Sequence, residues 1–158
     1  NFHFRLTKII IMKNVVALIT LMFAFSYEIH AKEYIFEVYG ESKLDTIKIS
    51  KNYKFSTYTS KGMWDDSEGD YGNENCTGYV KQLNDNVELE IYCETSNQYD
   101  ETFWNSRIRK SDKGAGVGQM TILNATGKYK DFIGLTCPYG VNYKNQFAWL
   151  RAECILEE

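Results

Sequence analysis

Apolar and polar residues alternate along most of the chain after residue 32, and no long stretch repeats every three to four residues. Because side chains on a strand point alternately to its two faces, this alternation predicts β-strands. Clusters rich in Asn, Asp, Gly and Lys separate the alternating segments and predict turns. The expected strands are 33–39, 45–50, 53–60, 76–83, 87–94, 102–110, 117–124, 132–143 and 146–156, with an irregular acidic surface loop over 61–75.

Many short strands joined by short connections are typical of two architectures, a closed antiparallel barrel and a sandwich of two sheets. Both are all-β, and the strand pattern alone leaves both open. No composition shift or linker divides residues 32–158, so we expect them to form a single domain.

The N-terminal part of the chain has the pattern of an export signal. A basic start at Met12 precedes an apolar stretch over 15–25, which is shorter than the roughly 20 residues that span a bilayer. We therefore predict a signal helix within residues 1–31, preceded by an upstream extension and cleaved after Ala31 or, alternatively, after Ser26. An uncleaved membrane anchor is the other interpretation. The signal predicts a periplasmic or extracellular protein without membrane insertion after cleavage.

Four cysteines, Cys76, Cys93, Cys137 and Cys154, form two equally spaced pairs, and each pair brackets two expected strands. Export to an oxidising compartment favours disulfides, which would each contribute about 3 kcal/mol for loops of this length. Four cysteines allow three connectivities, so the pairing within each hairpin is one of three. Reduced core cysteines are the alternative.

The cysteine pairs also predict a strand register. If each pair faces itself across a hairpin, the partners in the first hairpin are Cys76 with Cys93, Gly78 with Ile91, Val80 with Leu89, and Gln82 with Val87. In the second they are Cys137 with Cys154, Tyr139 with Ala152, Val141 with Leu150, and Tyr143 with Ala148. One face of each hairpin is then apolar, as a half-buried hairpin requires. On the polar face of the second hairpin, Phe147 and Trp149 are exceptions.

The chain is acidic, with 18 Lys and Arg against 21 Asp and Glu. Residues 1–31 hold three basic residues and one acidic residue, so the remainder is more acidic still. This charge argues against nucleic acid and anionic membranes as partners.

The two histidines, His3 and His30, both precede the expected cleavage after Ala31. A domain without histidine cannot run a Ser-His-Asp or Cys-His mechanism, and it lacks the usual ligands of catalytic zinc. The cysteines have no CxxC spacing, and the acidic run over 65–70 does not match an EF-hand. We therefore expect no metal, no cofactor and no catalytic triad, and favour a non-enzymatic protein.

Five residues are candidates for ligand binding. Trp104, Tyr139 and Tyr143 are expected to point inward, where they would line a cavity or only fill the core. Arg107 and Arg109 share one face of a strand and could grip a carboxylate, although a solvent-facing strand edge explains them equally well.

The segment Gly116–Gly134, with its Ala-Thr-Gly-Lys-Tyr-Lys run and a following glycine, resembles a hairpin of allene oxide cyclase-like and dirigent-like (calycin-like) barrels. The resemblance implies an eight-stranded antiparallel barrel with an apolar interior, which in those families takes an oxygenated fatty acid or a phenolic radical. No family catalytic residue maps onto this chain. The chain also resembles small exported bacterial proteins with cysteines at the positions of Cys76, Cys93 and Cys137.

These observations support two classes of function. The first is an exported, non-enzymatic barrel that binds a small apolar or amphipathic ligand, or an envelope interaction module. The second is a cyclase-like or carboxylate-dependent enzyme, for which a carboxylate such as Glu90 would be tested.

Overall fold

The structure, a computed structural model, describes residues 32–111 and 116–156. The predicted signal helix falls within residues 1–31 and so lies outside the described residues. The strands in chain order are β1 Lys32–Lys48, β2 Tyr53–Asp66, β3 Tyr71–Leu83, β4 Asn86–Asn97, β5 Thr102–Ser111, β6 Gly116–Ala125, β7 Thr136–Lys144 and β8 Phe147–Leu156, and a 3-10 helix, η1, spans Gly127–Phe132. None of the described helical segments has the length and hydropathy needed to cross a bilayer.

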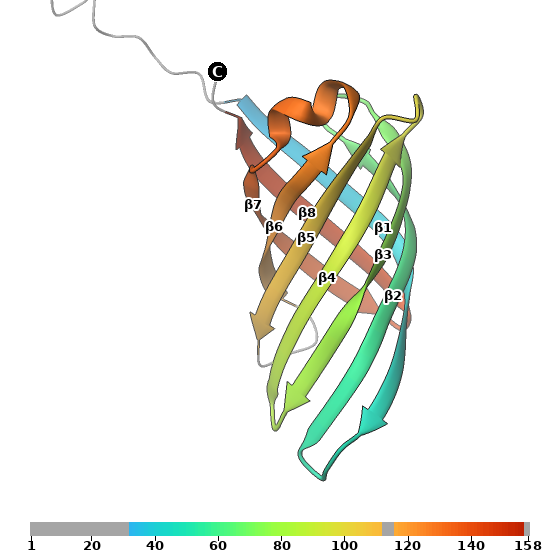
Figure 1. The fold of residues 1–158 in the computed structure, drawn as a ribbon, viewed down its shortest axis with the longest axis vertical. Helices are drawn as coiled ribbons and strands as arrows, with labels where there is room; N and C mark the ends of the chain where they lie inside the picture. Colours follow the sequence, from blue (N-terminus) through green and yellow to red (C-terminus); the bar gives the residue numbers. More distant parts are fainter. Residues whose placement is uncertain (1–31, 112–115, 157–158) are drawn as a thin grey trace, which may run out of the picture. The chain divides into compact units, whose positions relative to one another are not determined.

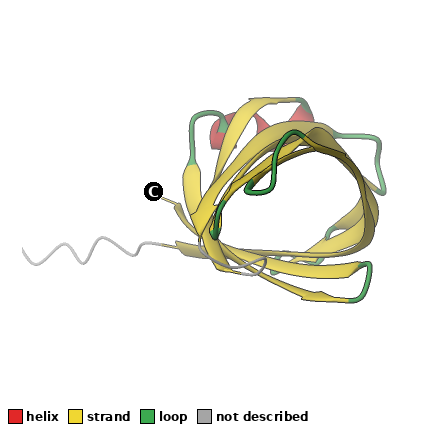
Figure 2. Cartoon of the chain, turned by 90° about the horizontal axis from the view of Figure 1, so that it is seen from below, coloured by secondary structure: helices red, strands yellow, loops and turns green. Residues whose placement is uncertain are grey.

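The eight strands form a closed antiparallel barrel in which each strand pairs with the next in sequence. β1 also pairs with β8, with Phe36 opposite Ala152, and this pairing closes the ring seen in Figure 2. The predicted eight-stranded barrel is therefore confirmed, and the two-sheet sandwich is excluded.

Three predicted boundaries are wrong. The segments 33–39 and 45–50 are one strand, β1, because its pairing with β2 runs without interruption from Phe36 to Lys48. Of residues 61–75, expected as a surface loop, only 67–70 form a turn; the others form the end of β2 and the start of β3, and Trp64 and Glu74 among them are buried. Alternation of apolar and polar residues does not reveal these strands, because the buried residues of the segment include the charged Asp70 and Glu74 as well as Trp64.

The strand expected at 132–143 begins only at Thr136, because η1 occupies the preceding residues. Figure 1 shows η1 at one end of the barrel. Its Tyr129 is fully buried, and its ring lies 5.1 Å from that of Phe103. The residues of the resemblance motif thus form a cap rather than a tight hairpin turn.

Both predicted disulfides are present, Cys76–Cys93 and Cys137–Cys154. The predicted partners in the first hairpin, such as Val80 with Leu89, all occur in the pairing of β3 with β4. The second hairpin likewise pairs β7 with β8 as expected. The alternation of apolar and polar residues therefore predicts the correct strand register in both hairpins.

The barrel interior divides into an apolar half and a more polar half. Most of the buried aromatic rings belong to the half nearer η1, where Phe36, Trp64, Phe103 and Tyr129 pack against one another. A smaller apolar cluster surrounds the Cys76–Cys93 disulfide.

Two glycines allow β1 and β2 to approach closely. Gly40 lies directly opposite Gly62 in the ladder. A Cβ at Gly40 would lie 2.6 Å from the carbonyl oxygen of Lys61, and a Cβ at Gly62 would lie 2.8 Å from that of Tyr39. Neither contact is sterically possible without a shift of the backbone, so this pair requires glycine.

Candidate functional site

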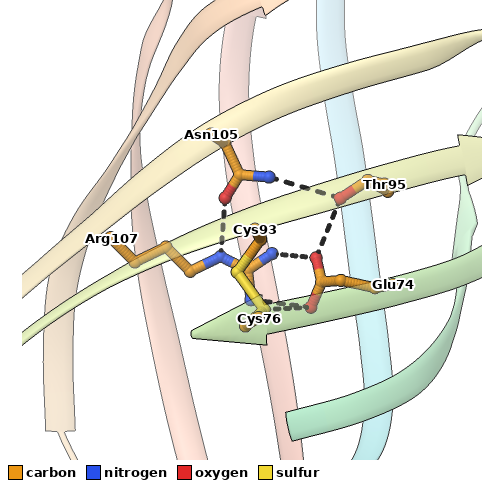
Figure 3. The surroundings of a disulfide bond; sticks show 6 residues. All are labelled: Glu74, Cys76, Cys93, Thr95, Asn105 and Arg107. Atoms are coloured by element: carbon orange, nitrogen blue, oxygen red, sulfur yellow. Dashed lines mark hydrogen bonds and ion pairs between the residues drawn. A yellow bond between two sulfur atoms is a disulfide. The ribbon is translucent and has the colours of Figure 1, made fainter. Parts of the chain in front are cut away.

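A buried ion pair lies within the barrel, between the side chains of Glu74 and Arg107 (Figure 3). Both side chains are almost fully buried, and the guanidinium donates two hydrogen bonds to the carboxylate, one of them from Nη1 to Oε1 at 3.0 Å. Bidentate geometry of this kind is the strongest that arginine forms with a carboxylate.

The polar atoms around this pair are also satisfied. Thr95 donates to Oε2 of Glu74 at 3.1 Å, and Asn105 accepts from Nε of Arg107 at 3.0 Å. The amide of Asn105 in turn donates to the hydroxyl of Thr95 at 3.3 Å. A complete network of this kind holds the charges in place and leaves Glu74 no spare role as a free acid or base.

The disulfide beside the ion pair does not form a metal site. Carboxylate and sulfur atoms of Glu74, Cys76 and Cys93 lie close enough together to suggest one. The two sulfur atoms, however, are bonded to each other, so neither is available as a thiolate ligand.

Both candidate arginines point into the barrel. Arg107 and Arg109 are each only 3% exposed, so the solvent-facing interpretation is wrong. The physical reason is that on β5 the inner face carries polar residues beyond Phe103, which reverses the usual pattern. The guanidinium of Arg109 lies over the ring of Tyr143, 5.9 Å from its centroid, and Nη1 donates to Ser111 at 3.5 Å.

The three candidate aromatics do not share one site. Trp104 lies on the outer face of β5, and its indole N–H donates to Glu94 at 3.0 Å, which corrects the expectation that it points inward. Tyr139 is buried inside the barrel, and Tyr143 is half-buried on the same inner face of β7. Burial is the main reason why the pKa of Tyr143 rises to about 12, so both phenols are neutral at ordinary pH.

The interior around these tyrosines leaves little space. The enclosed cavity there has a volume of about 30 Å³, and its walls include Tyr58, Tyr139, Tyr143 and Arg107. A volume of this size holds about one water molecule, whereas small-molecule sites measure about 300–1,000 Å³. In the described part of the chain, the barrel interior is therefore filled mainly by its own side chains.

The remaining carboxylates of interest serve structural contacts. Glu90 lies on the outer face and accepts hydrogen bonds from Tyr79 and Tyr92, and these two bonds lower the pKa of Glu90. The hydrogen bond to Glu90 is also the main reason why the pKa of Tyr79 rises to about 12. In the acidic turn, Asp66 accepts the backbone N–H of Glu68 at 2.8 Å. That hydrogen bond stabilises the turn between β2 and β3.

Asp70 belongs to the cap at the η1 end. Its carboxylate contacts the ammonium of Lys128 at 2.6 Å and accepts hydrogen bonds from Tyr129, Asn97 and Gln98. Burial alone would raise its pKa, but these donors outweigh burial and lower the pKa to about 2. The same contacts hold η1 against the end of the barrel.

The largest group of exposed aromatic side chains next to a hollow lies on the outer face, where β7, β8, β1 and β2 run side by side. This outer hollow has a volume of about 580 Å³. Four apolar side chains border it: Tyr39, Met63, Phe147 and Trp149, exposed by 49, 68, 54 and 45%. Exposed apolar side chains that gather around a hollow are typical of interaction sites.

The strand register explains this grouping. Tyr39 pairs with Met63 of β2 on one side and with Trp149 of β8 on the other. The rings of Tyr39 and Trp149 are nearly parallel, at an angle of 14° with centroids 6.5 Å apart. Partial desolvation and the hydrogen bond that Tyr39 donates to Glu37 raise the pKa of this phenol.

The floor and rim of the outer hollow differ in chemistry. Gly40, Gly62 and Ala148 occupy inward-facing positions of their strands, so they present only backbone to the hollow between the aromatic side chains. Charged and polar groups form the rim: Glu41, Lys61, Asn142 and Lys144. Among the described residues, none of the three charged rim residues takes part in a salt bridge.

Sequence reasoning found only half of this hollow. Phe147 and Trp149 stood out as apolar exceptions on a polar face, but Tyr39 and Met63 gave no such signal. Their grouping depends on the pairing of β1 with β8, which are separated by most of the chain. Four of the five ligand-binding candidates do not border this hollow. The fifth, Tyr143, borders both the hollow and the interior cavity.

Comparisons with known proteins identify the fold only. Neither protein-family models nor curated protein sequences match the chain. A conserved protein of unknown function from Rhodopseudomonas palustris has a similar structure, with a TM-score of 0.62 at 10% identity over 80% of this chain and 98% of that one. An enzyme from Penicillium herquei also has a TM-score of 0.62, at 9% identity over 80% and 95% of the two chains. The expected kinship with allene oxide cyclase-like and dirigent-like barrels stays a prediction.

Proposed function

We propose that this protein is an exported, non-enzymatic binding module that uses its outer hollow, rather than the barrel interior, to hold an amphipathic ligand. One observation carries the proposal. The outer hollow combines the volume of a ligand site, about 580 Å³, with four exposed apolar side chains. The interior cavity has only about 30 Å³, and two other surface hollows, of about 710 and 520 Å³, have fewer exposed apolar side chains.

The composition of the hollow also supports binding. Tyr and Trp are enriched at binding surfaces because their rigid rings bury large areas at little entropic cost, and Met is enriched because its flexible thioether chain adapts to a ligand. Three such side chains and one phenylalanine surround the hollow, and all four are exposed by 45 to 68%: Tyr39, Met63, Trp149 and Phe147. Export is supported by the two disulfides, which persist in oxidising compartments.

Three tryptophans provide a direct test, because each indole N–H reports a different place. Trp64 is buried in the barrel and donates to the carbonyl of Ser96, Trp104 lies on the outer face of β5, and Trp149 borders the outer hollow. Their indole signals in a ¹H–¹⁵N NMR spectrum can be assigned with Trp104→Phe and Trp149→Phe. The protein is then titrated with fatty acids, phenolics and soluble oligosaccharides.

We expect a ligand to shift the Trp149 signal and leave those of Trp64 and Trp104 in place. A shift of Trp64 without Trp149 would overturn the outer-hollow proposal and indicate binding inside the barrel. The absence of any shift across the panel would also contradict it.

Binding inside the barrel is the second candidate function. It is supported by Tyr139, Tyr143 and Arg107, which all border the enclosed cavity. A ligand there would have to displace side chains, because the cavity holds about one water molecule. The carboxylate-dependent enzyme has less support, since Glu74 is paired with Arg107, and Glu90 is a half-buried residue of the outer face that accepts hydrogen bonds from Tyr79 and Tyr92.

A further inference from the structure

The outer hollow is open to solvent, and this limits the ligands that it can hold. An apolar ligand binds because its surface leaves water, so its sites usually enclose most of the molecule. The hollow lies on the convex outer face of the barrel and is bordered by side chains that remain about half exposed. A ligand with one apolar face and a hydrated opposite face suits such a site better than a fatty acid does.

We infer that the outer hollow binds a neutral, β-linked oligosaccharide. This inference rests on the proposed function and names its ligand class. A pyranose ring has an apolar face of C–H groups and an edge of hydroxyl groups, so it combines the two surfaces that the hollow offers.

The aromatic side chains match the apolar face of a sugar. Tyr39 and Trp149 present two nearly parallel rings that stand on neighbouring strands. Aromatic faces carry a partial negative charge and attract the partly positive C–H groups of a sugar ring. Met63 extends this apolar surface to β2, and Phe147 extends it along β8, two residues before Trp149.

The strand spacing also fits an extended sugar chain. The ring centroids of Tyr39 and Trp149 lie 6.5 Å apart, and the backbones at Met63, Tyr39 and Trp149, which pair directly across β2, β1 and β8, repeat at the strand spacing of about 4.8 Å. This interval is close to the rise of one sugar unit in an extended β-linked chain. Successive units can therefore meet successive side chains across the strands.

The floor and rim suit the hydroxyl groups. Gly40 and Gly62 occupy inward-facing positions of their strands, so only backbone borders the hollow there and a flat ring can approach it between the aromatic residues. Asn142 and the charged rim residues Glu41 and Lys61 offer both donors and acceptors. The rim carries charges of both signs, which complements a neutral ligand with many hydroxyl groups better than an ionic one.

The same rim argues against a second copy of the chain or another protein as the occupant. The centres of protein interfaces are depleted in charged residues. Here Glu41 lies directly opposite both Lys61 and Phe147, so charged residues stand next to the apolar side chains rather than around a continuous apolar patch.

The test measures binding of cellohexaose and chitohexaose to the full domain by ¹H–¹⁵N NMR. We expect either sugar to shift the indole signal of Trp149, and Trp149→Ala to weaken binding by about tenfold or more. Trp104→Ala, which removes a half-buried tryptophan from the outer face of β5, away from the hollow, is the matched control and should bind as the unchanged protein does. The Trp64 signal reports that each variant is folded.

The outcomes separate this inference from the proposed function. If a fatty acid or phenolic shifts Trp149 and neither sugar does, the sugar inference is overturned while the outer hollow stands as a binding site. If nothing shifts Trp149, both fail. A dimer that forms with concentration and is lost in Trp149→Ala would show that the face binds a second copy, which also overturns the sugar inference.

Discussion

At the scale of single residues, the ion pair of Glu74 and Arg107 is the most consequential feature of the interior. Removing two charges from water is costly, and their attraction offsets that cost only when the hydrogen bonds around them are complete. Thr95 and Asn105 complete them here. The loss of one partner would therefore leave a buried, uncompensated charge.

We predict that Glu74→Gln lowers the free energy of unfolding by about 3–5 kcal/mol, because Arg107 would remain buried without its counter-charge. Urea denaturation followed by circular dichroism measures the change. The matched control is Glu88→Gln, which removes an exposed partner of Lys110 and should cost less than about 1 kcal/mol. Equal losses in the two variants would contradict this account.

A second prediction at this scale concerns acid stability. The pKa of Asp70 is lowered to about 2 in the folded protein, while in the unfolded chain it is near 4. A carboxyl whose pKa is lower in the folded state stabilises the fold above its unfolded pKa, and this contribution is lost as the pH falls through the folded pKa. Stability should therefore decline between about pH 4 and pH 2.

Unfolding in urea at pH values from 5 to 2 measures this decline. Asp70→Asn keeps some of the hydrogen bonds of Asp70 but cannot titrate, so its difference from the unchanged protein should shrink as the pH falls over that range. A difference that stays constant with pH would show that Asp70 does not contribute in this way.

At the scale of secondary structure, the pair Gly40 and Gly62 decides how β1 and β2 run together. The strands approach so closely there that a Cβ on either residue would meet the opposite backbone. The same pair forms the floor of the outer hollow. One local feature thus serves both the barrel and the proposed site.

We predict that Gly40→Ala destabilises the barrel by about 1–3 kcal/mol, because the added methyl group would lie 2.6 Å from the carbonyl oxygen of Lys61. Gly140→Ala is the matched control, since nothing lies within 4 Å of a Cβ at that position. It should change stability by less than about 0.5 kcal/mol. Thermal melting of the two variants compares them directly, and a stable Gly40→Ala would refute the close approach.

At the scale of the whole molecule, the two disulfides brace opposite sides of the ring. One joins β3 to β4 and the other joins β7 to β8, and these hairpins are separated by two strands in both directions around the closed barrel. Each closes a separation of 17 residues, so each restricts the unfolded chain locally and by a similar amount.

We predict that Cys76→Ala combined with Cys93→Ala lowers the free energy of unfolding by about 3 kcal/mol, and that the corresponding change at Cys137 and Cys154 has a similar effect. Urea denaturation with and without a reductant measures this. Mass spectrometry after alkylation should find no free thiol in the unreduced protein, and labelling of any of the four cysteines would contradict the two bridges.

The sequence by itself determined the strands and their local register. Side-chain alternation has a period of two, so a shift by one residue would have moved the cysteines of both hairpins to the polar face. This local constraint explains why the pairing of Cys76 with Cys93 was predicted correctly. The strands and short turns narrowed the fold to an all-β barrel or a sandwich, and the resemblance of Gly116–Gly134 to eight-stranded barrels favoured the barrel.

Only the tertiary structure decided what each face of the strands meets. Arg107 and Trp104 lie three residues apart on the same strand, and alternation alone could not say which of their faces turns inward. The answer depends on Glu74, which β3 brings into the interior to pair with Arg107. The outer hollow likewise exists because ring closure places Tyr39 beside Trp149, a contact between residues far apart in the chain.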